Sequence, residues 1–230
     1  MPPVSRPRLA VFDCDGTLVD SQHMIVAAMG TAFAGHGLAL PEANAVRRVV
    51  GLSLVEAVAE LAAGLDGAAH IGIAESYKRA FAGLRERQEH DELLYPGARE
   101  AIAALAEIGF TLGIATGKSL RGLRSALDRH GLAERFVTVQ TADDGPGKPH
   151  PEMLRRAMAE TGVPAGNTVM IGDTTFDMAM ARNAGCGSVG VAWGYHPVNH
   201  LLAAGADVLV HSFGELPAAV AQLTEARQCA

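Results

Sequence analysis

The sequence predicts an α/β fold, in which a Rossmann-like core with a parallel β-sheet carries an inserted α-helical cap domain. Six short apolar runs are typical of strands, and from residue 111 onward they alternate with helical patterns, as the βαβ units of a parallel sheet do. Residues 21–93 separate the first run from the others and contain helical patterns only. This segment is much longer than an ordinary connection between strands, so we interpret it as an insertion.

Each predicted strand is a short apolar run. In chain order the runs lie at residues 9–12, 111–115, 136–140, 168–171, 188–192 and 207–210. The helices between them show apolar residues at helical spacing, such as Ala98, Ile102 and Leu105 before a stop at Gly109. We expect the four strands that precede polar motifs to lie in the spatial order third, second, first, fourth, as in a Rossmann-like sheet.

Three helical patterns fill the insertion. Their apolar residues are Ile25, Met29 and Phe33, then Val46, Val50, Leu54, Val58 and Leu61, then Ile73, Tyr77, Phe81 and Leu84. We therefore predict a helical cap domain at residues 21–93 and a Rossmann-like core at residues 1–20 and 94–230, with hinges near residues 19–21 and 94–97.

Composition and charge are typical of a globular protein without a nucleic-acid partner. The chain has 230 residues, of which 49% are hydrophobic and 19% charged, and its formal net charge is −6. These values exclude a disordered chain, and no run of Lys or Arg suits a nucleic-acid backbone. The first apolar run is short and ends at Asp13, so it predicts neither a signal peptide nor a membrane span. Cys14, Cys186 and Cys229 lack metal-ligand spacing and predict free thiols, which favours a cytoplasmic location.

The first polar motif follows the first predicted strand and places two carboxylates together. Asp13 and Asp15 point to the same side of an extended segment, because side chains alternate with a period of two. Two carboxylates so close to an apolar strand end need a cation or a shared proton. Mg²⁺ is suitable, because a few carboxylate oxygens, waters and phosphate groups hold it. Gly16 allows a tight turn, after which Thr17 offers a hydroxyl or N–H group to an anion.

The fourth predicted strand is followed by two further carboxylates. Asp173 and Asp177 are four positions apart across a helix start, so both face the same corner of the site. Thr174 or Thr175 caps this helix, whose positive end favours nearby anions. Asp173 lies directly at the strand end and is the better metal ligand. Asp177 is expected to accept a hydrogen bond from metal-bound water and so to orient it.

The second and third strands are followed by groups suited to binding phosphate. Thr116 ends a strand and Gly117 leads into a helix, so a hydroxyl and backbone N–H groups can hold an anion. Lys148 lies in a loop fixed by Gly147 and Pro149. Near three carboxylates this lysine stays protonated, and it would reduce the repulsion between a carboxylate nucleophile and an incoming phosphate. The motifs therefore converge at the carboxyl edge of one sheet, where open α/β sheets bind ligands.

These four motifs, in this order and around a helical insertion, resemble those of the haloacid dehalogenase-like hydrolases, in the capped phosphatase branch similar to phosphoglycolate phosphatase and β-phosphoglucomutase. The resemblance implies a Mg²⁺-dependent enzyme in which Asp13 is the nucleophile and Asp15 is the general acid and then the general base. It implies phosphate binding by Thr116 and Lys148. It also implies that the Asp13 carboxylate, the Asp15 main-chain carbonyl and Asp173 hold the metal.

Four residues are expected as possible substrate contacts. Lys118 is more often a solvated helix start, but in the resembling mutase the matching loop touches the substrate. Arg47, Arg48 and Ser53 lie in or beside the cap stretch that meets the active site in this branch. The two arginines would bind a substrate anion or, as an equally favoured alternative, form a solvated helix face.

Other polar and aromatic residues near the motifs are expected to be structural. Asp20 and Ser21 are predicted N-caps of the first inserted helix. His196 lies in a loop near the motifs and is not expected to be a catalyst. Residues 193–195, a Trp-Gly-Tyr segment after a strand end, are expected to pack at the rim of the site.

The predicted function is that of a phosphoric monoester hydrolase acting on a small phosphorylated metabolite through an aspartyl-phosphate intermediate, with phosphoglycolate as one option. The cap would exclude water and select the alcohol part of the substrate. A dehalogenase is disfavoured because Asp15 is present, and a phosphonatase because the only cap lysine is Lys78. Two alternatives remain: a non-catalytic phosphate-binding regulatory protein, and a phosphosugar mutase, against which Leu54 counts because it occupies the position of the mutase's cap arginine.

Overall fold

The computed structural model describes residues 6–87 and 92–229. The strands of its main sheet are β1 Arg8–Phe12, β4 Phe110–Thr116, β5 Thr138–Thr141, β6 Thr168–Gly172, β7 Gly187–Val191 and β8 Val208–Val210. All neighbouring strands are parallel, in the order β5-β4-β1-β6-β7-β8. The predicted Rossmann-like sheet and the predicted order of its four motif-bearing strands are therefore confirmed.

Strand β1 lies in the interior of the sheet and aligns the ends of its neighbours. Phe12 pairs with Ile114 of β4 and with Ile171 of β6, so the motifs after these strands begin at one edge. The Asp13 N–H donates to the Ile171 carbonyl at 2.9 Å, which extends the alignment one residue beyond β1. The continuous apolar sequence of β1 suits this position, because both faces of the strand are covered.

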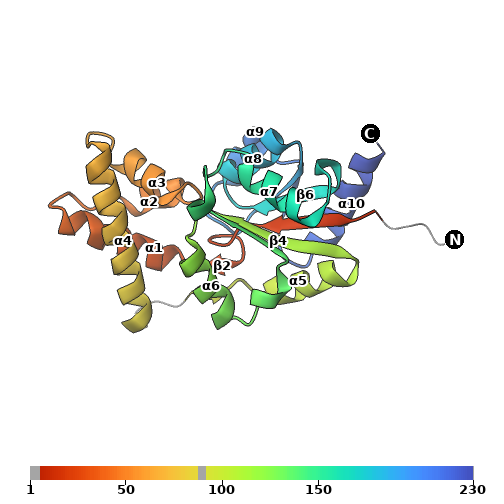
Figure 1. Cartoon of the computed structure of the whole chain (residues 1–230), viewed down its shortest axis with the longest axis horizontal. Helices are drawn as coiled ribbons and strands as arrows, with labels where there is room; N and C mark the ends of the chain where they lie inside the picture. The colour runs from red at the N-terminus through yellow and green to blue at the C-terminus, as the bar shows by residue number, and fades with distance from the viewer. Residues whose placement is uncertain (1–5, 88–91, 230) are drawn as a thin grey trace.

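Helices cover both faces of the sheet (Figure 1). They are α5 Ala98–Glu107, α6 Leu120–Arg129, α7 Glu152–Thr161, α8 Thr175–Ala184, α9 Val198–Ala204 and α10 Leu216–Gln228, with short 3₁₀ turns at Ala133–Arg135, Ala142–Asp144 and Ala165–Asn167. Ala10 and Phe12 of β1 pack in one apolar cluster with α5, α6 and α10, whereas Leu9 and Val11 pack in another with α7 and α8. This division follows the alternation of side chains along a strand.

The insertion is helical and has its own core. Its helices are α1 Gln22–Gly35, α2 Ala43–Val49, α3 Leu54–Leu61 and α4 Gly67–Arg87. They share a buried apolar cluster that includes Met24, Phe33 and Ile73, and Figure 1 shows them at the end of the molecule toward which β1 runs. They form the helical cap of the predicted fold class. Within the residues described, no helix combines the length and apolarity needed to cross a membrane.

The second helical pattern of the insertion, at residues 46–61, is divided between α2 and α3 instead of forming one helix. Gly51, in the turn between them, has a φ of +104°, a left-handed conformation that glycine adopts without steric cost. Ser53 then starts α3 through a capping box with Glu56. Because the apolar spacing continues across this turn, the pattern alone did not reveal the break.

A short antiparallel ribbon joins the insertion to the core. Strand β2, Val19–Asp20, pairs with strand β3, Leu93–Leu94. The sequence pattern predicted no strand within residues 21–93, and this is corrected at Leu93, because a two-residue strand is too short to show a period. The ribbon lies beside the boundaries predicted for the cap at residues 21–93, although the division into domains stays a prediction.

Candidate active site

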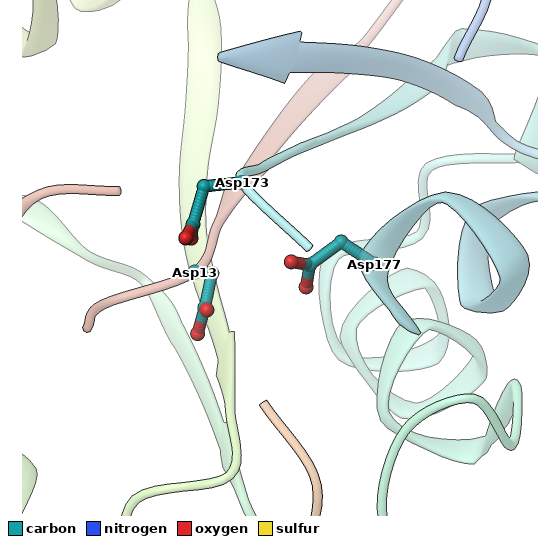
Figure 2. Close-up of side chains that lie close together, drawn as sticks. All are labelled: Asp13, Asp173 and Asp177. Atoms are coloured by element: carbon teal, nitrogen blue, oxygen red, sulfur yellow. The ribbon is translucent and has the colours of Figure 1, made fainter. Parts of the chain in front are cut away.

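Three carboxylates meet at the carboxyl edge of the sheet (Figure 2). Asp13 follows β1, Asp173 follows β6, and Asp177 lies in the first turn of α8. One oxygen from each lies within 4.8 Å of the other two. The side chains are buried, with exposed fractions of 1%, 0% and 0%. Oxygen ligands at this spacing are those that a hard divalent cation requires.

Lys148 places a positive charge against this cluster. Its Nζ lies 2.8 Å from Asp13 Oδ1 and 2.7 Å from Asp177 Oδ1, and its side chain is fully buried. Burial opposes the charged ammonium, but Asp13 and Asp177 outweigh burial and raise the pKa of Lys148 above its usual value. The lysine therefore stays protonated and ties the end of β1 to the start of α8.

One lysine does not balance three carboxylates. Burial raises the pKa of Asp13 to about 6, since the lowering by Lys148 is opposed by repulsion from Asp177. Burial, together with repulsion from Asp13 and Asp177, raises the pKa of Asp173 well above its usual value. Burial is the main cause of both shifts and repulsion between the carboxylates adds to it, so three buried carboxylates beside one lysine leave a deficit of positive charge. A divalent cation between Asp13 and Asp173 would remove this deficit, so the residues present fit a metal ion.

Asp173 is fixed by groups on both sides. The Thr17 hydroxyl donates to its Oδ1 at 2.8 Å, and the Tyr195 N–H donates to its Oδ2 at 2.8 Å. Two glycines let the backbone approach: a Cβ atom at Gly16 would lie 2.3 Å from Asp173 Oδ2, and one at Gly194 would lie 2.1 Å from Asp173 Cβ. Gly194 and Tyr195 were expected only to pack at the rim, whereas they also position a proposed metal ligand.

Asp177 has both carboxylate oxygens engaged. Its Oδ2 accepts hydrogen bonds from the Thr174 N–H at 3.0 Å and the Thr174 hydroxyl at 2.7 Å, which makes the capping box of α8. Its Oδ1 is the atom that faces Lys148. Because both oxygens have partners, Asp177 is better placed to hold Lys148 and the helix start than to ligate a metal directly.

Asp15 lies in a second cluster of charges. Lys118 Nζ is 2.8 Å and 3.1 Å from its two oxygens, and the Ser21 hydroxyl donates to Oδ1 at 2.5 Å. Glu92, only 1% exposed, lies 3.5 Å from Lys118 Nζ and 2.7 Å from Arg85 Nε. Burial opposes the charge of Lys118, but Asp15, Cys14 and Glu92 together outweigh burial and raise the pKa of the lysine. The cluster joins both ends of the insertion to the loop after β4.

Three members of this second cluster were absent from the predicted site. Ser21 does occupy the N-cap position of α1, but its side chain caps nothing there because it bonds to Asp15. Arg85 lies in the last turn of α4, directly after the apolar pattern, and Glu92 directly precedes β3. The one available signal was Glu92 itself, a charged residue beside an apolar pair at a predicted domain boundary.

Thr116 and Gly117 border a cavity between core and cap. The cavity has a volume of about 510 Å³, and Asp13, Asp15 and Lys118 also line it. A Cβ atom at Gly117 would lie 2.5 Å from the Leu52 carbonyl oxygen, so the turn between α2 and α3 packs directly on this loop. Residues of the first three motifs thus line this cavity, and Asp173 and Asp177 of the fourth lie behind Asp13 in the carboxylate cluster.

Of the remaining three possible substrate contacts, only Ser53 lines the cavity. Ser53 lines the cavity, although its hydroxyl donates to Glu56 at 2.6 Å. Arg47 and Arg48 do not line it. Arg47 Nε instead donates to the Gln22 side chain at 3.0 Å, and the exposed Arg48 contributes only its carbonyl, 3.1 Å from His196 Nε2.

Known proteins share this arrangement over nearly the whole chain. The model of a family described as haloacid dehalogenase-like hydrolase matches residues 10–191. The chain belongs to this family. A relative of this haloacid dehalogenase-like hydrolase, the probable phosphatase IndB of Dickeya dadantii, is 37% identical over 212 residues, which cover 90% of this chain and 91% of that protein. The phosphoglycolate phosphatase of Vibrio parahaemolyticus is 30% identical over 222 residues, which cover 93% and 96%.

Solved structures agree with the fold of this haloacid dehalogenase-like hydrolase. The crystal structure of a predicted phosphatase from Clostridium acetobutylicum matches with a TM-score of 0.84 and 24% identity, and the match covers 95% of this chain and 100% of that one. This likeness confirms the predicted fold class, and the family match with the two relatives confirms the predicted family and the assignment as a hydrolase. The roles of the individual residues stay predictions.

Proposed function

We propose that the chain is a Mg²⁺-dependent phosphatase that hydrolyses a small phosphorylated metabolite through an aspartyl-phosphate on Asp13. The observation that carries this proposal is the placement of Asp13 and Asp15 on the wall of one cavity, the first beside a lysine and two carboxylates, the second beside a separate lysine. One carboxylate is thus arranged to receive a phosphoryl group and the other to handle a proton. The names of two relatives, a probable phosphatase and a phosphoglycolate phosphatase, support the same reaction class.

The metal would be held by the carboxylates of Asp13 and Asp173 and by the main-chain carbonyl of Asp15. When bound, Mg²⁺ supplies positive charge to the phosphoryl oxygens. Asp173 is prepared for this role by Thr17 and by the Tyr195 N–H, which fix its carboxylate before any ligand binds.

In the proposed reaction, an oxygen of Asp13 forms a bond to phosphorus while the bond from phosphorus to the alcohol oxygen breaks. Asp15 gives its proton to the departing alkoxide. A water molecule then attacks the aspartyl-phosphate, Asp15 takes the proton from this water, and inorganic phosphate leaves. Lys148, the Thr116 hydroxyl and the Gly117 N–H would bind the phosphoryl oxygens as charge develops on them.

The ion pair between Lys118 and Asp15 favours the second step of this reaction, in which Asp15 takes a proton from water. An ammonium 2.8 Å from the carboxylate stabilises charged Asp15, which is the form that accepts a proton from water. The first half requires the protonated acid. Asp15 therefore has to gain a proton before the alcohol departs, while Glu92 remains a partner of Lys118 at 3.5 Å.

The direct test is release of inorganic phosphate from a panel of phosphate monoesters, measured with Mg²⁺, with EDTA, and with Mg²⁺ restored after EDTA. We expect turnover of at least one ester with Mg²⁺, its loss with EDTA, and its recovery on restoration, because Asp13 and Asp173 need a cation between them. Turnover that persists in EDTA contradicts the metal requirement. A folded protein that binds phosphate but turns over no ester contradicts the phosphatase.

The raised pKa values predict how Mg²⁺ stabilises the protein. Without metal, folded Asp13 titrates near pH 6, whereas in the unfolded chain it titrates near 3.8, so the folded state holds its proton more tightly. Its contribution to the free energy of unfolding therefore falls as the pH rises from about 4 to 6, by on the order of 3 kcal/mol. Above that range the carboxylate is charged, and a cation relieves the penalty. We expect the rise in melting temperature caused by Mg²⁺ to be larger at pH 7.5 than at pH 5.

Thermal melts with Mg²⁺ and with EDTA at both pH values measure this difference, and comparison at fixed pH cancels the titration of distant groups. Asp173→Asn is the matched variant, and it should lose most of the Mg²⁺ effect. If Mg²⁺ raises the melting temperature equally at both pH values, or more at pH 5, the carboxylate cluster does not lack positive charge.

A further inference from the structure

The part of the cavity formed by α1–α4 and their connections is mainly apolar. It is the inner surface of the buried cluster that holds these helices together. The side chains that form it are Ile25, Met29, Val46, Val50, Leu54 and Phe81. The phosphate-binding groups lie on the opposite side, after the strands of the sheet. A substrate whose phosphate faces Asp13 would therefore direct its alcohol part onto this apolar surface.

The charged groups beside the apolar surface are already paired. Lys118 lies 2.8 Å from Asp15, and Glu92 lies between Lys118 and Arg85. These two cations and two anions cancel in charge. Lys78 pairs with Glu75 at 2.8 Å and is half exposed, and Arg121 lies at the exposed rim. Among the described residues that line the inner cavity, no buried cation is left for a second negative group on the substrate.

One hydrogen-bond donor remains available. Arg85 lines the cavity, and its terminal Nη2 is buried without a hydrogen-bond partner in the part of the chain that the structure describes. Because the guanidinium charge is already balanced by Glu92, a neutral acceptor such as a carbonyl or hydroxyl oxygen would satisfy this N–H group. Next to it, Arg85 and Lys118 lie over the Phe81 ring at 5.1 and 4.9 Å, and the Tyr77 ring adds a further aromatic side chain to the cavity wall.

The volume of the cavity indicates the size of the alcohol part of the substrate. Its volume of about 510 Å³ lies within the range of sites that enclose ligands of many atoms. A two-carbon acid would leave much of the apolar surface uncovered and would place its carboxylate against it. The volume, the apolar surface and the balanced charges therefore favour the same kind of alcohol.

We propose that the preferred substrates are phosphate monoesters of an uncharged, ring-sized alcohol that carries a hydrogen-bond acceptor, rather than small carboxylate-bearing esters such as phosphoglycolate. This proposal rests on the phosphatase function proposed above. It assigns recognition of the ring to the apolar surface and recognition of the acceptor to Arg85.

The test uses two esters of the same shape, 4-carbamoylbenzyl phosphate and 4-carboxybenzyl phosphate, with phosphoglycolate as the small acid. We expect kcat/KM for the amide to exceed that for either acid by about tenfold or more, because only the acids place an unpaired charge against the apolar wall. Leu54→Arg adds a cation to that wall and should shift the ratio toward 4-carboxybenzyl phosphate by about tenfold. Ile71→Arg adds the same charge at an exposed site outside the cavity lining and should leave the ratio unchanged.

Turnover with an acid preferred over the amide overturns the substrate class while leaving the phosphatase function standing. Absence of turnover with every ester overturns the phosphatase function instead. In that case calorimetry on Asp13→Asn with the two benzyl esters still tests whether the cavity prefers the uncharged alcohol. Tighter binding of the amide supports it, and equal or tighter binding of the acid overturns it.

Discussion

Replacement of Asp13 by Asn is expected to lower kcat for phosphate release by about 10⁴-fold or more, because the amide cannot form the acyl-phosphate that divides the reaction into two displacements. The protein should remain folded. Asn has nearly the same shape as Asp, and the substitution removes one of three carboxylates that share a single lysine. Phosphate release by a coupled assay and a thermal melt without metal measure the two effects. The melting temperature without metal should be equal to or higher than that of the native protein.

Asp128→Asn is the matched control, because Asp128 is an exposed carboxylate on α6 outside the main cavity and its loss should leave kcat unchanged. Rapid acid quenching of the native protein during turnover should trap a phosphorylated chain that Asp13→Asn lacks. Full activity in Asp13→Asn would show that Asp13 is not the nucleophile. Retained phosphate binding, with no activity in either protein, favours the regulatory alternative.

Replacement of Lys148 by Met is expected to destabilise the protein without metal by about 3–5 kcal/mol, because it leaves Asp13, Asp173 and Asp177 buried with no cation among them. Mg²⁺ should recover part of this loss. The same change should lower kcat/KM by about 10²–10³-fold, because a charge next to the phosphoryl oxygens is lost from a buried site. Urea unfolding with Mg²⁺ and with EDTA measures the first effect, and steady-state kinetics the second.

Two further variants test whether the destabilisation by Lys148→Met comes from unpaired buried charge. Lys78→Met removes a half-exposed lysine that pairs with Glu75, and it should change stability by no more than about 1 kcal/mol. Lys148→Met combined with Asp177→Asn should be more stable than Lys148→Met alone, because the second change removes one unpaired carboxylate. If Lys148→Met unfolds like the native protein in EDTA, Lys148 does not balance the cluster.

The features that the sequence predicted well are local ones. The residues of β1 form a continuous apolar run, and the motif after it begins where the run ends, so the strand and its carboxylates could be placed together. Parallel pairing of Phe12 with Ile114 and with Ile171 then brought the separate motifs to one edge. Nothing beyond short runs and the rules of open α/β sheets was needed for this part.

The features that the sequence did not reveal are contacts between distant segments. Lys118 and Asp15 belong to separate loops, and no pattern links Glu92 to either. Likewise, the Tyr195 N–H reaches Asp173 because the loop after β7 folds back over the end of β6. Such pairs depend on side-chain direction and backbone approach, neither of which periodicity encodes.

The ribbon of β2 and β3 has a mechanical consequence. Its two residue pairs, Val19 with Leu94 and Asp20 with Leu93, bring both connections of the insertion side by side, so the hinges predicted near residues 19–21 and 94–97 would act as a single pivot. A rotation displaces each atom in proportion to its distance from the axis. Ser21 and Glu92, directly beside the ribbon, would move little, whereas the turn between α2 and α3, which packs on Gly117, would move away from that loop. Swinging the helices outward would therefore uncover the phosphoryl end of the cavity while the proton-handling groups stay assembled.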